Sequence, residues 1–330
     1  MKSITLGTKL AWHHRFGLIF LALVFSVACR AEVQHYQVAA STTDSRIASF
    51  DSPHSIYIDP SANARNQLLV FLTGTGAKTT LASQEFSRTA AALGYHVIDL
   101  MYPNAVPATI CWQAPSADCF GAFRREIVTG ADSSPLIQVS REESIENRLL
   151  QVLRFLAARQ PQGGWGQFLQ GNTAIAWEKV ALAGQSQGGG HAAWMARERR
   201  VARVIMLGAP KDFHRRLGRP ASWYGPGQTP AERMFAFVHE RDEQGCSFAQ
   251  QLEIFRTMGL PGEPVVVDDA RPPYGDSHRL VTRYADGQLS SKEAHVTVIS
   301  PRLRGRDGQP LFKAVWTYML TAPTGPRPVR

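Results

Sequence analysis

The chain has 330 residues, 44% of them hydrophobic and 19% charged, so it contains enough apolar side chains for a sizeable core. Its formal net charge of +9 would suit a nucleic-acid partner, but the arginines are scattered and no nucleic-acid-binding motif accompanies them. We therefore expect no nucleic-acid partner. No internal repeat divides the sequence, so we expect a single domain over residues 32–330.

The first 31 residues differ in composition from the rest of the chain. Basic residues precede an apolar run from Phe16 to Ala28, which is shorter than the roughly 20 residues that a membrane-spanning helix needs. A basic start followed by a short apolar run is typical of a signal peptide. We predict a signal peptide over residues 1–31, export to the periplasm or the exterior, and no transmembrane span. Cleavage after Ala28 would make Cys29 the first residue of the mature chain, so a lipid anchor at Cys29 is an alternative.

Apolar periodicity predicts alternating strands and helices along most of the chain. Strands have alternating or continuous apolar runs, whereas helices have apolar residues at three- and four-residue spacing. In chain order, strand patterns lie at 35–40, 55–59, 66–76, 95–102, 177–184, 201–210, 234–238, 264–269 and 278–284, and helix patterns at 82–93, 142–160, 185–199, 248–259 and 311–320. The segment 111–139 is irregular. This alternation predicts an α/β fold, a doubly wound and mostly parallel sheet with helices on both faces.

The cysteines outside the leader suggest one crosslink. Cys111 and Cys119 enclose a short loop, which makes them the natural disulfide pair in an oxidising compartment. Cys246 is then left over. We expect it to be buried as a small hydrophobic residue, because no reactive-thiol motif surrounds it.

The strongest chemical signal is the run Gly184-Gln185-Ser186-Gln187-Gly188, which fits the G-x-S-x-G pattern between a predicted strand and a predicted helix. A serine on such a sharp turn needs glycines on both sides, since larger side chains would collide with the neighbouring strand and helix. The turn also places the hydroxyl at the carboxyl ends of the strands, where ligands bind in open α/β sheets. The pattern indicates that Ser186 is a nucleophile.

A nucleophilic serine needs an acid and a base, in the chain order serine, acid, histidine. Asp242 directly follows the predicted strand 234–238 and is our first choice for the acid. Glu240 and Glu243 lie in the same loop, and the pair 268–269 follows the next strand, so these remain alternatives.

Two late histidines are candidates for the base. His295 precedes the last predicted helix in a segment that looks like a loop, and we favour it. His278 begins an extended segment and is the alternative base. His191, inside the helix that follows the serine, is expected to be a packing residue.

Two backbone amides should stabilise the oxyanion of an acyl-transfer intermediate. We assign one to Gln187, which follows the nucleophile, and the other to Thr75, in the glycine-containing loop 74–76. That loop lacks the Gly-Lys-Ser/Thr of a Walker motif and the third glycine of a dinucleotide motif. We expect no cofactor and no metal site.

With these motifs in view, the chain resembles the α/β-hydrolase superfamily, specifically secreted bacterial esterases of the cutinase and acetyl-xylan-esterase type. The matching segments are "LLVFLTGTG", "VALAGQSQGGGHA", "MLGAP" and "TPAERMFAFVHERDE", followed by a late histidine. The resemblance implies a serine carboxylic-ester hydrolase with Ser186, Asp242 and His295 as the catalytic triad, and with Thr75 and Gln187 at the oxyanion hole. An acyltransferase or peptidase with the same triad and a non-catalytic cell-surface binding protein on a hydrolase scaffold are the alternatives.

Aromatic residues near this site could contact the substrate. Trp112 lies in the cysteine loop, and Trp223 and Tyr224 lie in the insert 211–229. We expect them to form an aromatic wall, with packing under a loop as the alternative. The expected partner is a small or polymeric ester, and we expect the chain to be a monomer.

Overall fold

A computed structural model describes residue 1 and residues 32–325 of the chain. The predicted signal peptide over 1–31 and the lipid anchor at Cys29 fall outside the described residues and stay predictions. In the described part, no helix has both the length and the apolar character needed to cross a membrane.

Within the described residues, nine strands form one sheet in the order β1-β2-β4-β3-β7-β8-β11-β13-β12. In chain order these are β1 (Gln34–Val38), β2 (His54–Ile58), β3 (Leu68–Leu72), β4 (His96–Leu100), β7 (Val180–Gln185), β8 (Arg203–Leu207), β11 (Met234–His239), β12 (Val265–Val266) and β13 (Arg279–Thr282). Strand β2 runs antiparallel to both of its neighbours, and every pair from β4 to β12 is parallel. Two short hairpins, β5 (Leu169–Gln170) with β6 (Ala174–Ile175) and β9 (Phe213–His214) with β10 (Arg219–Pro220), stand apart from it.

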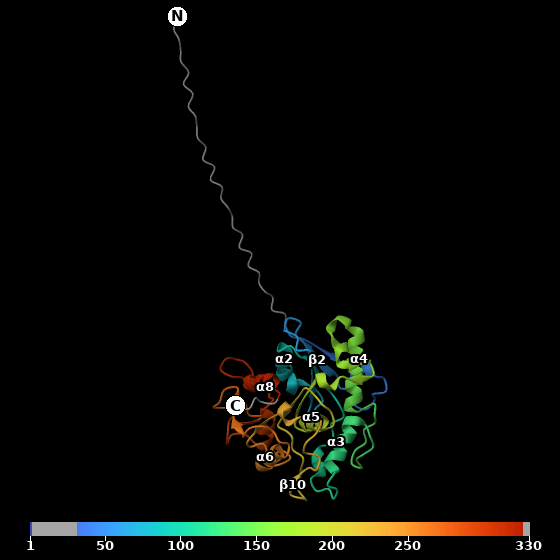
Figure 1. Ribbon diagram of the computed structural model, residues 1–330, viewed down its shortest axis with the longest axis vertical. Coiled ribbons are helices and arrows are strands. Elements are labelled where there is room, and N and C mark those ends of the chain that lie inside the picture. The colour runs from blue at the N-terminus through green and yellow to red at the C-terminus, as the bar shows by residue number, and fades with distance from the viewer. Residues whose placement is uncertain (2–31, 326–330) are drawn as a thin grey trace. The chain divides into compact units, whose positions relative to one another are not determined.

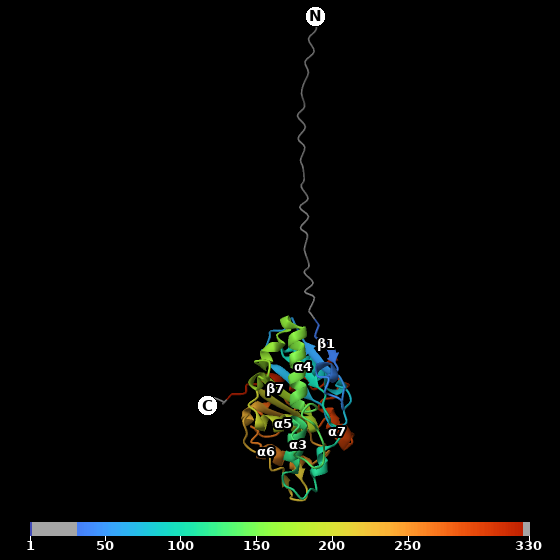
Figure 2. The same ribbon diagram turned by 90° about the vertical axis from the view of Figure 1, so that its right-hand side faces the viewer.

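Helices cover both faces of this sheet (Figures 1 and 2). They are α1 (Ala40–Thr43), α2 (Gln84–Ala92), α3 (Cys119–Thr129), α4 (Ile145–Arg159), α5 (Gln187–Glu198), α6 (Phe248–Thr257), α7 (Ser291–Thr297) and α8 (Lys313–Thr321). Helix α3 packs against α4 and α5, and α2 packs against α8. The two groups belong to two separate apolar clusters.

Strand β3 shows why the central strands are continuously apolar. All five of its residues are buried. Leu68, Val70 and Leu72 belong to the cluster of α3, α4 and α5, whereas Leu69 and Phe71 belong to the cluster of α2 and α8. Successive side chains of a strand point to opposite faces, so a strand that is covered on both faces needs apolar residues at every position.

The strand order, the antiparallel second strand and the parallel remainder together define the α/β-hydrolase fold. The prediction of a doubly wound, mostly parallel sheet with helices on both faces is therefore confirmed. Strands β3 and β4, which are joined through α2, form one of its parallel pairs.

Three local predictions were wrong. Helix α3 lies inside the segment 111–139 that was expected to be irregular, and β12 has only two residues. His295 lies in helix α7, not in a loop. Ser290 and Glu293 form a capping box at the start of α7, and their S-x-x-E spacing is the sequence sign of a helix start that apolar periodicity alone overlooks.

Candidate active site

Ser186 lies where β7 ends and α5 begins, at the carboxyl edge of the parallel strands. Its backbone angles are φ 55° and ψ −122°. A side chain in such a conformation costs on the order of 1–3 kcal/mol, so the surrounding structure must hold it. The Ser186 N–H donates to the Leu207 carbonyl at 2.9 Å, and the Gly190 N–H donates to the Ser186 carbonyl at 3.1 Å. The sharp turn expected from the motif is present.

The glycines on both sides of Ser186 are required by close backbone contacts. A Cβ at Gly184 would lie 2.3 Å from the carbonyl carbon of Gly188. A Cβ at Gly188 would lie 2.1 Å from the carbonyl oxygen of Leu72 in β3. Any larger residue would push α5 away from the sheet and move the serine with it.

Asp242 and His295 form a buried pair near this edge. Asp242 follows β11 and its side chain is fully buried. The Nδ1 of His295 lies 2.8 Å from Asp242 Oδ2. Because the carboxylate can only accept, Nδ1 carries the proton and Nε2 is left as an acceptor. This is the tautomer that a general base for a serine hydroxyl needs.

Lys211 is a second partner of Asp242 that the sequence did not suggest. Its Nζ lies 2.8 Å from Asp242 Oδ1, and the Gln244 N–H donates to the same oxygen at 3.0 Å. Burial raises the pKa of Asp242, but the hydrogen bond from His295 and the charge of Lys211 outweigh it, so the net pKa is lowered. Asp242 is therefore ionised at neutral pH, and the stability that this charge provides is lost as the pH falls through the lowered pKa.

Removal of the Lys211 charge should change the pH dependence of activity. In Lys211→Met, the Asp242 carboxylate loses the cation beside it, so the pKa of Asp242 rises and the negative charge next to His295 is no longer offset. The low-pH limb of kcat/KM is expected to move up by roughly one pH unit. The measurement is a pH profile of ester hydrolysis between pH 4 and 9.

The same profile needs a matched control and a rescue. Lys292→Met removes an exposed charge from α7, the helix that carries His295, and should leave the limb in place. Lys211→Arg should restore it. An unshifted limb in Lys211→Met would show that Lys211 has only a structural role.

Gln185 also contacts His295, and the sequence reasoning missed this residue. Its Nε2 lies 3.1 Å from His295 Nε2, so the amide donates to the nitrogen that would face a serine hydroxyl. Within residues 32–325, Ser186 Oγ has no hydrogen-bond partner.

Both residues assigned to the oxyanion hole border the same pocket as Ser186. Gln187 is the first residue of α5, where backbone N–H groups have no partner inside the helix. Its side-chain Oε1 accepts from the Thr75 hydroxyl at 3.0 Å and from the Ala108 N–H at 2.8 Å. These bonds tie the loop after β3 to the start of α5.

The pocket at Ser186 is narrow, with a volume of about 50 Å³. A single water needs roughly 10–15 Å³ by this measure, so the cavity takes only a few heavy atoms. Its lining includes Thr75, Trp112, Gln187 and Lys211 as well as the serine. A short acyl group would fit it.

The predicted disulfide between Cys111 and Cys119 is confirmed, and the loop that it closes forms one wall of the pocket. Trp112 lies in this crosslinked loop. The Trp112 carbonyl accepts from the Arg216 N–H at 3.3 Å, which joins the loop to the β9–β10 hairpin. Cys246 is free and buried, as expected, and burial raises the pKa of its thiol to about 12.

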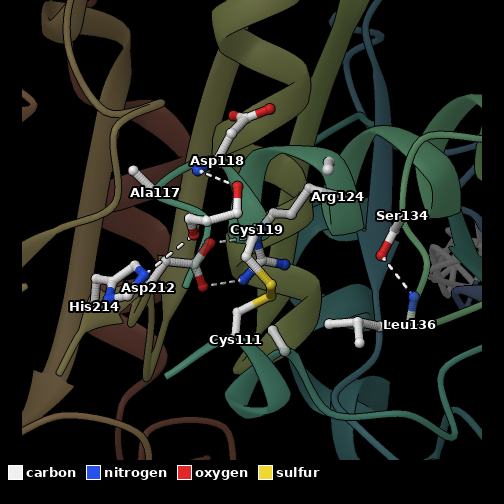
Figure 3. Close-up of a disulfide and its surroundings, with 12 residues drawn as sticks. Cys111, Ala117, Asp118, Cys119, Arg124, Ser134, Leu136, Asp212 and His214 are labelled. Carbon is white, nitrogen blue, oxygen red and sulfur yellow. Dashed lines mark hydrogen bonds and ion pairs between the residues drawn. A yellow bond between two sulfur atoms is a disulfide. The ribbon is translucent and has the colours of Figure 1, made fainter. Parts of the chain in front are cut away.

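A buried ion pair, Arg124 with Asp212, lines the pocket and lies beside the disulfide (Figure 3). Arg124 donates to both carboxylate oxygens of Asp212, at 2.7 and 2.6 Å, and to the Gln187 carbonyl at 3.0 Å. Trp223 donates to Asp212 Oδ2 at 3.0 Å, and the Tyr224 hydroxyl accepts from the Asp212 N–H at 3.1 Å. Trp223 and Tyr224 are buried and contact this pair, whereas Trp112 lines the pocket, so of the three expected wall residues Trp112 alone has a place beside it; its contact with a substrate stays a prediction.

The other sequence candidates lie elsewhere. His278 precedes β13 and is stacked on Phe235 at 4.0 Å, with Nδ1 2.9 Å from the Met234 carbonyl. It therefore lies at the amino edge of the sheet, opposite Ser186. His191 is fully buried in α5, where burial and then the charge of Arg124 lower its pKa well below the usual range.

Two of the alternative acids, Asp268 and Glu240, have other partners. Asp268 accepts from the Thr282 hydroxyl at 2.7 Å and from the Arg283 N–H at 2.8 Å. Glu240 pairs with the Arg283 guanidinium. Of the carboxylates considered, Asp242 is the one that contacts His295.

Comparisons with known proteins give distant structural likenesses. No protein-family model matches the sequence, and no curated protein matches it. Esterase B from Lactobacillus rhamnosis is similar with a TM-score of 0.44 and 13% identity, over 83% of this chain and 81% of that one. An esterase of the bacterial hormone-sensitive lipase family gives 0.39 and 14%, over 88% and 84%. Dienelactone hydrolase from Anabaena variabilis gives 0.36 and 16%, over 76% and 86%. The fold assignment stands on the strand order.

Proposed function

We propose that this chain is a serine hydrolase that cleaves carboxylic esters through an acyl-enzyme intermediate, with Ser186, His295 and Asp242 as its triad. The observation that carries the proposal is the position of Ser186. It is held at a positive φ between β7 and α5, lines a pocket, and lies at the edge of the sheet where the Asp242–His295 pair is built.

The reaction follows from this arrangement. The amide of Gln185 swings away from His295 Nε2, which then takes the proton of the Ser186 hydroxyl as its oxygen attacks the ester carbonyl. Asp242 stabilises the imidazolium that forms. The N–H groups of Gln187 and Thr75 bind the oxyanion, and the protonated His295 gives its proton to the leaving alcohol. Water, activated by the same histidine, then releases the acid and the free serine.

Single substitutions test whether His295 or His278 is the base. His295→Ala is expected to lower kcat for p-nitrophenyl acetate by about 10⁴-fold or more, because serine and histidine act as a unit. His278→Ala should keep the activity of whatever fraction remains folded, which circular dichroism and active-site titration would measure. Loss of turnover in folded His278→Ala with retention in His295→Ala would overturn the assignment.

A further inference from the structure

Arg215 contacts two residues that line the pocket containing Ser186. Its guanidinium carbon is 3.5 Å from the ring centre of Trp112, and its Nη2 makes a long hydrogen bond of 3.4 Å to the Gly245 carbonyl. Trp112 and Gly245 both line the pocket, but they come from the disulfide loop and from the loop after Asp242, respectively. The guanidinium therefore bridges two walls of the pocket.

The other cations of this site already have counter-charges. Arg124 is paired with Asp212 at 2.6 Å, and Lys211 is paired with Asp242 at 2.8 Å. Arg215 is exposed, and across residues 32–325 it takes part in no salt bridge. Its positive charge is thus available to an anion bound beside the pocket.

The stacking of Arg215 on Trp112 favours recognition of a planar anion. A guanidinium that lies on an aromatic ring keeps its N–H donors in its own plane, directed away from the ring. The stacked position also restricts the side chain before the ligand arrives, so less conformational entropy is lost on binding. Carboxylates match this fork of donors with two parallel hydrogen bonds.

We propose that Arg215 selects esters that carry a carboxylate on the part of the substrate that projects from the pocket. The proposal rests on the ester-hydrolase function, because it names the substrate class of the same site. The narrow cavity of about 50 Å³ receives a short acyl group. The remainder of the ester passes beneath Arg215, which binds its carboxylate.

Two acetate esters of similar size test the proposal. 4-Acetoxybenzoate carries a carboxylate opposite the ester, and 4-acetoxybenzamide carries a neutral amide in its place. kcat/KM is measured for both with the unaltered full-length chain, with Arg215→Gln and with Arg216→Gln. Arg216 is the adjacent exposed arginine, so this control removes the same charge one residue away. Comparing the ratio of the two esters between proteins cancels their different chemical reactivities.

Arg215→Gln is expected to lower the preference for the carboxylate ester by about tenfold or more, the usual size of a charge-assisted hydrogen bond. Its kcat/KM for the amide should stay within about threefold of the unaltered chain. The preference should also fall in about 0.5 M NaCl, because the site is open to solvent. Arg216→Gln should retain the preference.

Two outcomes would overturn the proposal while ester hydrolysis stands. One is an equal ratio of the two esters in the unaltered chain and in Arg215→Gln. The other is an equal loss of preference in Arg216→Gln, which would assign the effect to the general positive field of the hairpin. If neither ester were turned over and Ser186 stayed unlabelled by a fluorophosphonate, the ester-hydrolase function itself would fall, together with the inference built on it.

Discussion

Ser186→Ala is expected to lower kcat for p-nitrophenyl acetate by about a millionfold, because no acyl-enzyme can form without the hydroxyl. Alanine keeps the Cβ that already occupies this turn, so the free energy of unfolding should change by less than about 1 kcal/mol. Steady-state kinetics and urea denaturation measure the two effects separately. The combination of lost turnover and retained stability identifies a chemical role.

A fluorophosphonate probe provides the companion measurement. It should label the unaltered chain at Ser186 and leave Ser186→Ala unlabelled. Ser222→Ala is the matched control, because Ser222 is an exposed serine just after the β9–β10 hairpin, and its hydroxyl donates to the Ala117 carbonyl of the disulfide loop at 3.1 Å. It should be labelled and active. Full activity in Ser186→Ala would remove the basis of the proposed function.

Asp212→Asn is expected to lower the free energy of unfolding by about 3–5 kcal/mol, because it leaves the Arg124 guanidinium buried without a counter-charge. Each side chain of the pair is only 2% exposed. Activity should fall as well, since Arg124 also holds the carbonyl of Gln187 at the start of α5. Urea denaturation followed by tryptophan fluorescence gives the stability.

Two further variants make this prediction specific. Asp118→Asn removes an exposed carboxylate drawn in the same view (Figure 3) and should change the stability by less than about 0.5 kcal/mol. The double variant with Arg124→Met and Asp212→Asn removes both charges and should be more stable than Asp212→Asn alone. If the double variant were no more stable than Asp212→Asn, the loss of stability could not come from a buried Arg124 charge without a partner.

Much of the fold was readable from the sequence because its signals are local. The burial of β3 can be predicted from its five consecutive apolar residues, and that of α4 from its periodic apolar pattern. The glycines on both sides of Ser186 indicate a sharp turn, and this signal lies within five adjacent residues. Likewise, Cys111 and Cys119 are only eight positions apart, so their disulfide could be predicted without knowledge of the rest of the chain.

The missed features depend on contacts between distant segments. Arg124 and Asp212 are 88 positions apart, and Lys211 reaches Asp242 across 31. Neither spacing carries a local pattern. Lys211 and Asp242 meet because the neighbouring strands β8 and β11 end at the same edge of the sheet, and Arg124 reaches Asp212 from helix α3, which packs against α5. Trp223 was expected to face the substrate because its sequence neighbours do not show which distant segments pack against it. Composition shows that a loop is aromatic, but tertiary packing decides on which side the rings lie.

If the proposed function holds, we expect substrate fit to depend on redox conditions through the crosslink between Cys111 and Cys119. The loop it closes supplies Trp112, and Trp112 in turn supports the guanidinium of Arg215. Thiol reductants would leave the nine-stranded sheet and the serine turn intact, whereas the loop that holds Trp112 beside the pocket would become less rigid. Protein prepared in a reducing host should therefore turn over small, reactive acetates normally but discriminate poorly among larger ones, and air oxidation should bring the discrimination back.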